Sequence, residues 1–310
     1  MAQGPQALGV AALLGGLAVL AAATPKRKER PLAALPATLL PAPLTSRRDT
    51  VSRQLNGAAA LLALAALSDS AIEHYRGSFH NRTMYVPLGG AALTLLASLR
   101  DAIAPAASDR GERNAIDTVA VATGILGTCF HFYNIAKRPS GFSWLNLFYS
   151  APLGAPASLS LAGLLRRMAL LIRRRALIAG TMPGRALAWL VSFGLLGTSA
   201  EAALLHFRGA YHNPAMIIPV TAPPIAAGLL AGASAAPGRA HPLARWVLRL
   251  VAAAGLLGSG FHAYGISRNM GGWRNWSQNI LNGPPLPAPP AFTALAIAGL
   301  AALSLIERRR

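Results

Sequence analysis

The segment HYRGSFHNRTMYVP at residues 74–87 recurs, altered, as HFRGAYHNPAMIIP at residues 206–219. Seven of the fourteen positions are identical: two histidines and one Arg, Gly, Asn, Met and Pro. An acidic residue lies five positions before the first histidine of each copy, Asp69 in one and Glu201 in the other. The chain therefore contains an internal duplication, and both copies retain the same polar residues within an otherwise apolar sequence.

A second repeated motif adds a third histidine to each copy. Residues 124–133, GILGTCFHFY, match residues 255–264, GLLGSGFHAY. Six of the seven histidines thus fall into two matched sets, which are His74, His80 and His131, and His206, His212 and His262. The seventh, His241, lies beside a proline in a basic segment, where we expect it to be solvated.

The composition is typical of a polytopic membrane protein. Of the 310 residues, 53% are hydrophobic and 13% are charged, and the mean hydropathy is +0.42. The net charge of +19 comes from basic clusters between apolar runs. This pattern favours membrane lipid as a partner and argues against nucleic acid. Cys129 is the only cysteine, which excludes a disulfide framework, a thiolate iron–sulfur cluster and a cysteine-rich zinc site.

The sequence predicts an all-α fold of about nine transmembrane helices. An apolar run at 6–23 precedes a basic cluster, so we expect a transmembrane helix within residues 1–24 and a Pro- and Arg-rich cytoplasmic linker over residues 25–54. Eight further runs are long enough to cross a ~30 Å hydrocarbon core. They are 56–76, 84–100, 116–136, 149–166, 186–207, 215–234, 245–265 and 289–306.

The fourth of these eight spans is the least regular. Pro152 and Pro156 interrupt it, and we expect Arg166 and Arg167 to end it, because a charged side chain is costly inside lipid.

The distribution of basic residues predicts the orientation. Of the 29 Lys and Arg residues, 22 lie in the linker, in alternate loops and in the C-terminal tail, and seven lie in the other loops. The positive-inside rule places the larger group in the cytoplasm of a protein of the inner (plasma) membrane. The two predicted four-helix repeats, 55–176 and 177–310, then run parallel about an axis along the membrane normal. All six repeated histidines would share the extracytoplasmic face.

Two local features should fix the repeated histidines in place. Gly77 and Gly209 are expected to end their helices, and Asn81 and Asn213 to cap the next ones, with Pro214 at a first helical position. The aromatic loops that follow the third histidine of each set are expected at the membrane interface, where they could form a lid.

Matched histidines in membrane helices favour a cofactor site, because buried ionisable groups in membranes are usually functional. Two b-type haems would each need a pair of axial imidazoles within a four-helix bundle. His74 with His131, and His206 with His262, fit that requirement. The sequence therefore predicts an electron-transfer subunit, with no catalytic nucleophile of its own, that links a periplasmic redox partner or dehydrogenase to the quinone pool.

Glycines and arginines near these histidines would complete the haem sites. Gly127 and Gly258 lie four residues before the third histidine, on the same helical face, and could leave a groove for a macrocycle. Close helix packing through small residues is the alternative. Arg76 and Arg208 could pair with haem propionates, or could extend to the membrane interface.

Two other functions remain open from the sequence. A non-haem copper or iron site could use all three histidines of each set. Asp69 and Glu201 would then act as proton relays or as groups behind the ligands, because they lie ~7.5 Å deeper than the first histidine and ~140° around the helix. A proton-coupled transporter could use the same two carboxyl groups as proton carriers.

Overall fold

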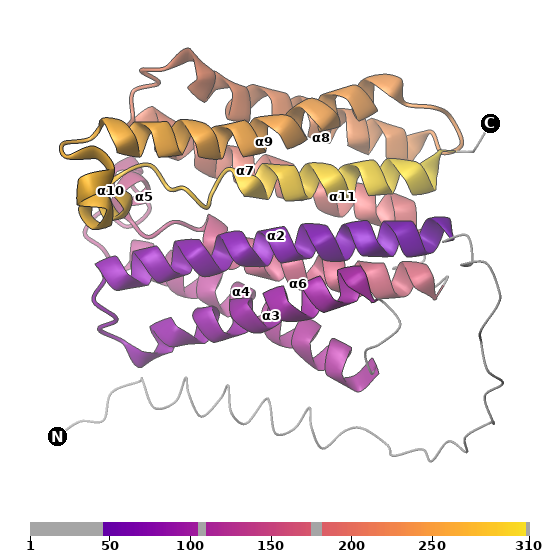
Figure 1. Ribbon diagram of the computed structural model, residues 1–310, viewed down its shortest axis with the longest axis horizontal. Helices are drawn as coiled ribbons and strands as arrows, with labels where there is room; N and C mark the ends of the chain where they lie inside the picture. Colours follow the sequence, from indigo (N-terminus) through magenta and orange to yellow (C-terminus); the bar gives the residue numbers. More distant parts are fainter. Residues whose placement is uncertain (1–45, 105–109, 175–181, 308–310) are drawn as a thin grey trace.

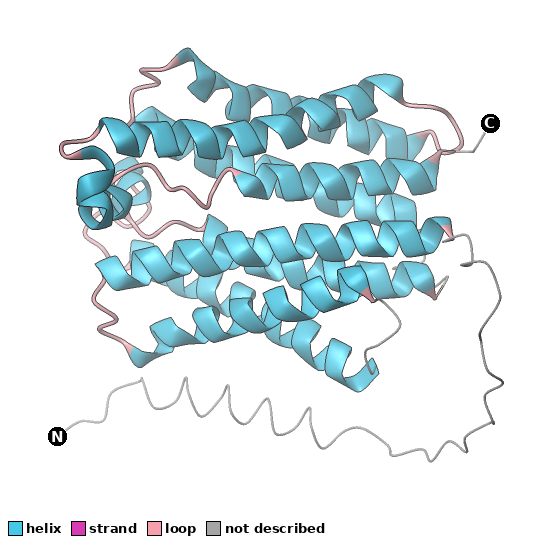
Figure 2. Cartoon of the chain, in the orientation of Figure 1, coloured by secondary structure: helices cyan, strands magenta, loops and turns pink. Residues whose placement is uncertain are grey.

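The computed structural model describes residues 46–104, 110–174 and 182–307. Every regular element in these ranges is a helix (Figures 1 and 2), and seven helices are long and apolar enough to cross a membrane. An eighth apolar helix has 17 residues. The all-α membrane architecture is thereby confirmed. The helix predicted within residues 1–24 lies outside the described residues.

The same order of long helices occurs in the two halves of the chain, which we call the first half (46–174) and the second half (182–307). The first half contains α2 (Arg47–Arg76), α3 (Val86–Ile103), α4 (Arg110–Ala136) and α6 (Gly154–Arg173). The second half contains α7 (Pro183–Arg208), α8 (Ile218–Ala235), α9 (Pro242–Arg268) and α11 (Pro290–Ile306). The short helices are η1 (Arg82–Tyr85), α5 (Trp144–Tyr149), η2 (Pro214–Ile217), η3 (Gly272–Asn275) and α10 (Trp276–Asn282).

Each half packs as a four-helix bundle. In the first half, α2 and α4 each contact both α3 and α6, and in the second half α7 and α9 each contact both α8 and α11. The halves join where α2 meets α11 and α7 meets α6. A continuous core of buried Ala, Leu, Val and Ile side chains runs through this junction. Alanine supplies much of it, which allows the close helix approach common in membrane proteins.

The repeated histidines lie at one end of the molecule. This end holds the C-terminal ends of α2, α4, α7 and α9, and the short helices α5 and α10 lie there within the longer loops (Figures 1 and 2). We call it the histidine end, and the other end, where α2 begins and α11 finishes, the opposite end.

Two predicted boundaries are wrong. α2 begins at Arg47, well before residue 56, so the last part of the predicted linker is helical. The fourth span begins at Gly154 and continues to Arg173, past Arg166, which was expected to end it. Arg166 is buried and forms ion pairs with Asp117 (2.6 Å) and Asp101 (3.1 Å). The helix continues because its charge is neutralised inside the bundle and not exposed to lipid.

Candidate functional site

The turn after each first histidine has the same geometry in both halves. α2 and α7 end before Gly77 and Gly209, and Asn81 and Asn213 then cap η1 and η2 as predicted. The glycines themselves have negative φ. The left-handed residues are the next two in each turn, which are Ser78 and Phe79, and Ala210 and Tyr211.

Gly77 and Gly209 instead lie close to the side chain of a methionine. A Cβ on Gly77 would lie 3.0 Å from Cε of Met84, and a Cβ on Gly209 would lie 3.2 Å from Cε of Met216. Each repeated methionine therefore packs back onto the glycine of its own turn, which holds the turn against the start of the next helix.

All six repeated histidines form a hydrogen bond between Nδ1 and a backbone carbonyl oxygen. In the first half, Nδ1 of His74 contacts the carbonyl of Met84 (2.6 Å) and Nδ1 of His131 that of Pro152 (2.6 Å). In the second half, the partners are His206 with Met216 (2.9 Å) and His262 with Pro285 (2.7 Å). His80 and His212 bond to the carbonyls of Gly77 (2.9 Å) and Gly209 (3.0 Å).

These bonds determine the tautomer of each ring. A carbonyl oxygen only accepts, so Nδ1 carries the hydrogen and, in the neutral ring, Nε2 keeps a free lone pair. No hydrogen bond to any of the six Nε2 atoms occurs within the described ranges. Histidines that bind metals are usually held in this way, by a bond from the other ring nitrogen that orients the ring.

The helix-borne histidines are also paired in space. His131 is close enough to His74 to interact electrostatically, and His262 is close enough to His206. α2 and α4 both pack on α3 and α6, so they lie diagonally across the first bundle, as α7 and α9 do across the second. Each pair therefore comes from two diagonal helices at the histidine end.

On α2, α3, α7 and α8 the buried positions stop short of these pairs, whereas Ile135 of α4 and Ile266 of α9 are buried one turn beyond the histidines of those helices. The last buried residue of α2 is Ser70, one turn before His74, and that of α7 is Ser199, nearly two turns before His206. The first buried residues of α3 and α8 are Gly90 and Pro223. Side chains of these four helices around the histidines are thus only partly covered by protein.

The two glycines predicted to form a groove pack against neighbouring helices. A Cβ on Gly127 would lie 3.0 Å from Cβ of Pro156 in α6, and one on Gly258 would lie 2.9 Å from Cβ of Pro289. Proline atoms therefore occupy the space expected for a macrocycle. The glycines permit the close approach of α4 to α6 and of α9 to α11, and they do not line a groove for a cofactor.

The two arginines have protein partners. Arg76 pairs with Glu73 at 2.7 Å. Arg208 donates to the carbonyl oxygen of Phe148 (3.1 Å), and its guanidinium lies over the ring of Tyr149. These contacts explain both arginines without a propionate.

Of the two predicted relay residues, Glu201 has a structural contact. It accepts a hydrogen bond from the backbone N–H of Gly154 (2.8 Å), at the start of α6, and so links α7 of the second half to α6 of the first. Asp69 is close enough to interact electrostatically with Glu201, but no hydrogen bond to it occurs in the described structure. Neither residue contacts a repeated histidine through a hydrogen bond.

The short helices α5 and α10 at the histidine end each contact the other half of the molecule. α5 packs on α7, where Phe148 stacks on Phe207 with ring centroids 5.3 Å apart, and α10 contacts α2. The aromatic loops thus lie against the ends of the two helices that carry His206 and His74.

Across residues 46–104, 110–174 and 182–307, no group of three or more His, Cys, Asp or Glu side chains is arranged to hold a metal ion. The three-histidine metal site that the sequence left open is therefore not assembled there. The carbonyl partners Met84, Met216, Pro152 and Pro285 were not predicted. The sequence signal that could have predicted them is that these residues recur at similar sequence separations after the matched histidines.

Comparison with known protein families, curated proteins and solved structures finds no match for this chain.

Proposed function

We propose that the protein is a membrane electron-transfer subunit that holds two b-type haems, one between His74 and His131 and one between His206 and His262. The observation that carries the proposal is the matched orientation of these four rings. Each is tied through Nδ1 to the chain that enters the next helix, and each keeps Nε2 free.

The residues fit axial ligation in three respects. Their carbonyl bonds restrict ring rotation and increase the basicity of Nε2. Each pair comes from diagonal helices of one bundle, an arrangement that allows two imidazoles to face each other. The residues of α2 and α7 around His74 and His206 are only partly buried, so these two rings are not fully enclosed by protein side chains. A bis-histidine haem supplies one-electron transfer between ferrous and ferric iron.

The remaining parts of the proposal come from the sequence. The duplication yields two sites at one end, and the positive-inside rule assigns that end to the extracytoplasmic side of the inner membrane. An outer redox protein or dehydrogenase would deliver electrons one at a time. Two electrons and two protons would convert one membrane quinone to its quinol. Asp69 is the carboxyl group left for proton transfer, since Glu201 binds the start of α6.

The other two functions have less support. A transporter of two parallel repeats needs a path between them, and the junction of α2, α6, α7 and α11 is filled by buried apolar side chains. A three-histidine copper or iron site would require His80 and His212 to join the helix-borne pairs, and such a group is not formed among the described residues.

Absorption spectroscopy of the full-length protein purified from membranes tests the proposal. We expect a Soret band and a reduced α band for two haems per chain. His131→Ala and His262→Ala should each remove about half of the bound haem, because loss of one axial ligand prevents bis-histidine coordination.

His241→Ala is the matched control, because His241 lies outside the two sets and its ring contacts the carbonyl of Ala236 at the opposite end. It should retain the full spectrum. A colourless protein that carries copper or iron, lost in His80→Ala, would replace the haem assignment with the non-haem one. A colourless protein without metal would refute both.

A further inference from the structure

Glu73 is an acidic residue of the histidine end that the duplication does not repeat. It lies directly before His74, whereas the residue directly before His206 is Leu205. The side chain of Glu73 is 28% exposed, so water screens its charge less than that of a fully exposed carboxylate. It is close enough to both His74 and His131 to interact electrostatically with each ring. The first histidine pair therefore has a carboxylate at its edge, at a position where the second half has a leucine.

The matched arginines beside the two histidine pairs have different partners. Arg76 forms an ion pair with the Glu73 carboxylate at 2.7 Å. Arg208 instead donates to the carbonyl oxygen of Phe148 and lies over the ring of Tyr149, neither of which carries a negative charge. The partner of Arg76 thus adds one negative charge to the first site that these partners of Arg208 do not add to the second.

The other charged residues do not cancel this difference. Asp69 and Glu201 occupy matched positions, and the remaining acidic residue of the described second half, Glu307, pairs with Arg245 at the opposite end. The arginines of the histidine end that have no counterpart are exposed to solvent, which screens their charges. They are Arg82, Arg138 and Arg274.

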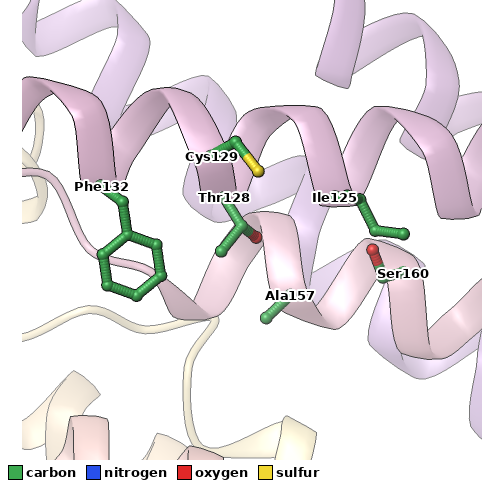
Figure 3. A pocket seen from close by; sticks show the side chains of 6 residues that line it. All are labelled: Ile125, Thr128, Cys129, Phe132, Ala157 and Ser160. Atoms are coloured by element: carbon green, nitrogen blue, oxygen red, sulfur yellow. The ribbon is translucent and has the colours of Figure 1, made fainter.

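The side of α4 that faces α6 next to His131 does not distinguish the halves by charge. Figure 3 shows this contact, where every labelled side chain is uncharged: Ile125, Thr128, Cys129, Phe132, Ala157 and Ser160. By the sequence repeat, the residues at the matched positions of the second half are uncharged as well: Leu256, Ser259, Gly260, Ala263, Pro290 and Thr293. The difference in charge between the two sites therefore comes from α2, through Glu73.

We propose that the Glu73 carboxylate gives the haem between His74 and His131 the lower midpoint potential of the two, so that an electron passes from the first half to the second. The inference rests on the proposed function, since it needs both haems. A nearby negative charge stabilises ferric iron, which carries one more positive charge than ferrous iron. One electron moves in this step. Iron at the first pair is oxidised from ferrous to ferric, and iron at the second pair is reduced from ferric to ferrous.

Potentiometric titration of the haem absorption of the full-length protein tests the inference. His262→Ala should retain only the first haem and His131→Ala only the second, so the two midpoint potentials are assigned separately. We expect the lower value for the first haem. Glu73→Leu copies the second half and should raise that value, so that the ratio of ferrous to ferric iron at a fixed applied potential increases roughly three- to tenfold. A tenfold change corresponds to about 59 mV for one electron.

Three further variants separate the charge of Glu73 from its packing. Glu73→Gln keeps the shape of the side chain and should raise the potential of the first haem as Glu73→Leu does. Leu205→Glu is the reciprocal change and should lower the potential of the second haem. Glu307→Gln is the matched control, because it removes a carboxylate at the opposite end, and it should leave both potentials unchanged.

A higher potential for the first haem would overturn the inference. So would an unchanged potential of the first haem in both Glu73 variants, and in either case full haem absorption would leave the proposed function standing. A colourless parent protein would refute the proposed function and, with it, this inference.

Discussion

Corresponding positions in the two halves are filled by charges in one and by apolar side chains in the other. In the first half, Asp101, Arg113, Asp117 and Arg166 form a buried cluster towards the opposite end of the bundle. In the second half, the sequence repeat places Ala233, Ala244, Leu248 and Gly299 at the same positions.

The apolar set fills the space that the charges occupy. A Cβ on Gly299 would lie 2.9 Å from a methyl group of Leu248 and 3.4 Å from one of Leu230. Leu230 corresponds to Ser98, whose hydroxyl lies 3.4 Å from Nη1 of Arg166. Leu230 and Leu248 thus fill the space beside Gly299, the position that corresponds to Arg166. The same helix packing thus occurs with buried charges in one half and apolar side chains in the other, provided that each buried charge has an opposite charge beside it.

The largest expected effect comes from removing one member of the cluster. Arg166→Ala leaves Asp117 and Asp101 buried with fewer partners and should reduce the free energy of unfolding by about 3–5 kcal/mol. Thermal and SDS-induced unfolding in detergent would measure it.

Grafting the second-half residues into the first half sharpens the comparison. The combined variant Ser98→Leu, Asp101→Ala, Arg113→Ala, Asp117→Leu and Arg166→Gly should recover most of the stability lost in Arg166→Ala, because it removes all four charges of the buried cluster together. A combined variant less stable than Arg166→Ala would show that the cluster has a role that apolar packing does not replace.

The next largest loss of stability is expected where α4 packs on α6 in the first half and, equivalently, where α9 packs on α11 in the second half. A Cβ on Gly124 would overlap the hydroxyl of Ser160 and the carbonyl oxygen of Pro156, and one on Gly255 would overlap the hydroxyl of Thr293. Gly124→Ala should therefore destabilise the protein by roughly 1–3 kcal/mol through overpacking, measured by the same unfolding assay. Gly260→Ala is the control and should have little effect, so equal losses in both variants would contradict a packing role.

A smaller loss of stability is expected from removing the carboxyl group of Glu201, and a still smaller one from removing that of Asp69, the equivalent residue of the first half. Glu201 accepts from the N–H of Gly154, whereas the position that corresponds to Gly154 in the second half is Pro287, which has no N–H for Asp69. Glu201→Ala should lose roughly 0.5–2 kcal/mol, the usual range for a helix cap. Asp69→Ala should lose less, and a larger loss than for Glu201→Ala would reverse the assignment.

The smallest effect is pH-dependent. Burial alone would raise the pKa of Glu307, but hydrogen bonds from the Arg245 side chain and the His241 backbone N–H lower it below its usual value. The carboxylate therefore stabilises the fold above its unfolded pKa of about 4.3. This contribution is lost as the pH falls through the lower folded value.

Glu307→Gln should thus be less stable than the parent by up to about 1 kcal/mol at pH 7 and equal to it in strong acid. The first half has Asn114 and Arg174 at the corresponding positions, so a carboxylate pair is absent there by sequence. Unfolding curves of the two proteins collected between pH 7 and pH 3 should show the difference in their free energies of unfolding becoming smaller as the pH falls. A difference that does not change with pH would contradict the prediction.

Much of the candidate site was predictable because its signals are local. The repeated Asn81 and Asn213 cap their helices, and alternating helix direction brings all six repeated histidines to one end. The carbonyl groups that bind the histidine rings were harder to predict from the sequence. His131 and Pro152 are 21 residues apart, and only the path of the loop between α4 and α6 brings them within 2.6 Å.

The amino-acid sequence determined where the long apolar helices lie, apart from some of their ends, and which polar residues the two halves share, since apolar run length and caps act within a few residues of the chain. Tertiary structure decided what each residue faces. Arg166 marks the end of a span by its charge, yet it lies inside the bundle because Asp101 and Asp117 arrive there on two other helices. The spacing of Gly127 and Gly258 before the histidines likewise predicts a groove on the helix face. In the structure each glycine faces a proline at the start of a neighbouring helix, because the packing of the helices decides which surfaces meet.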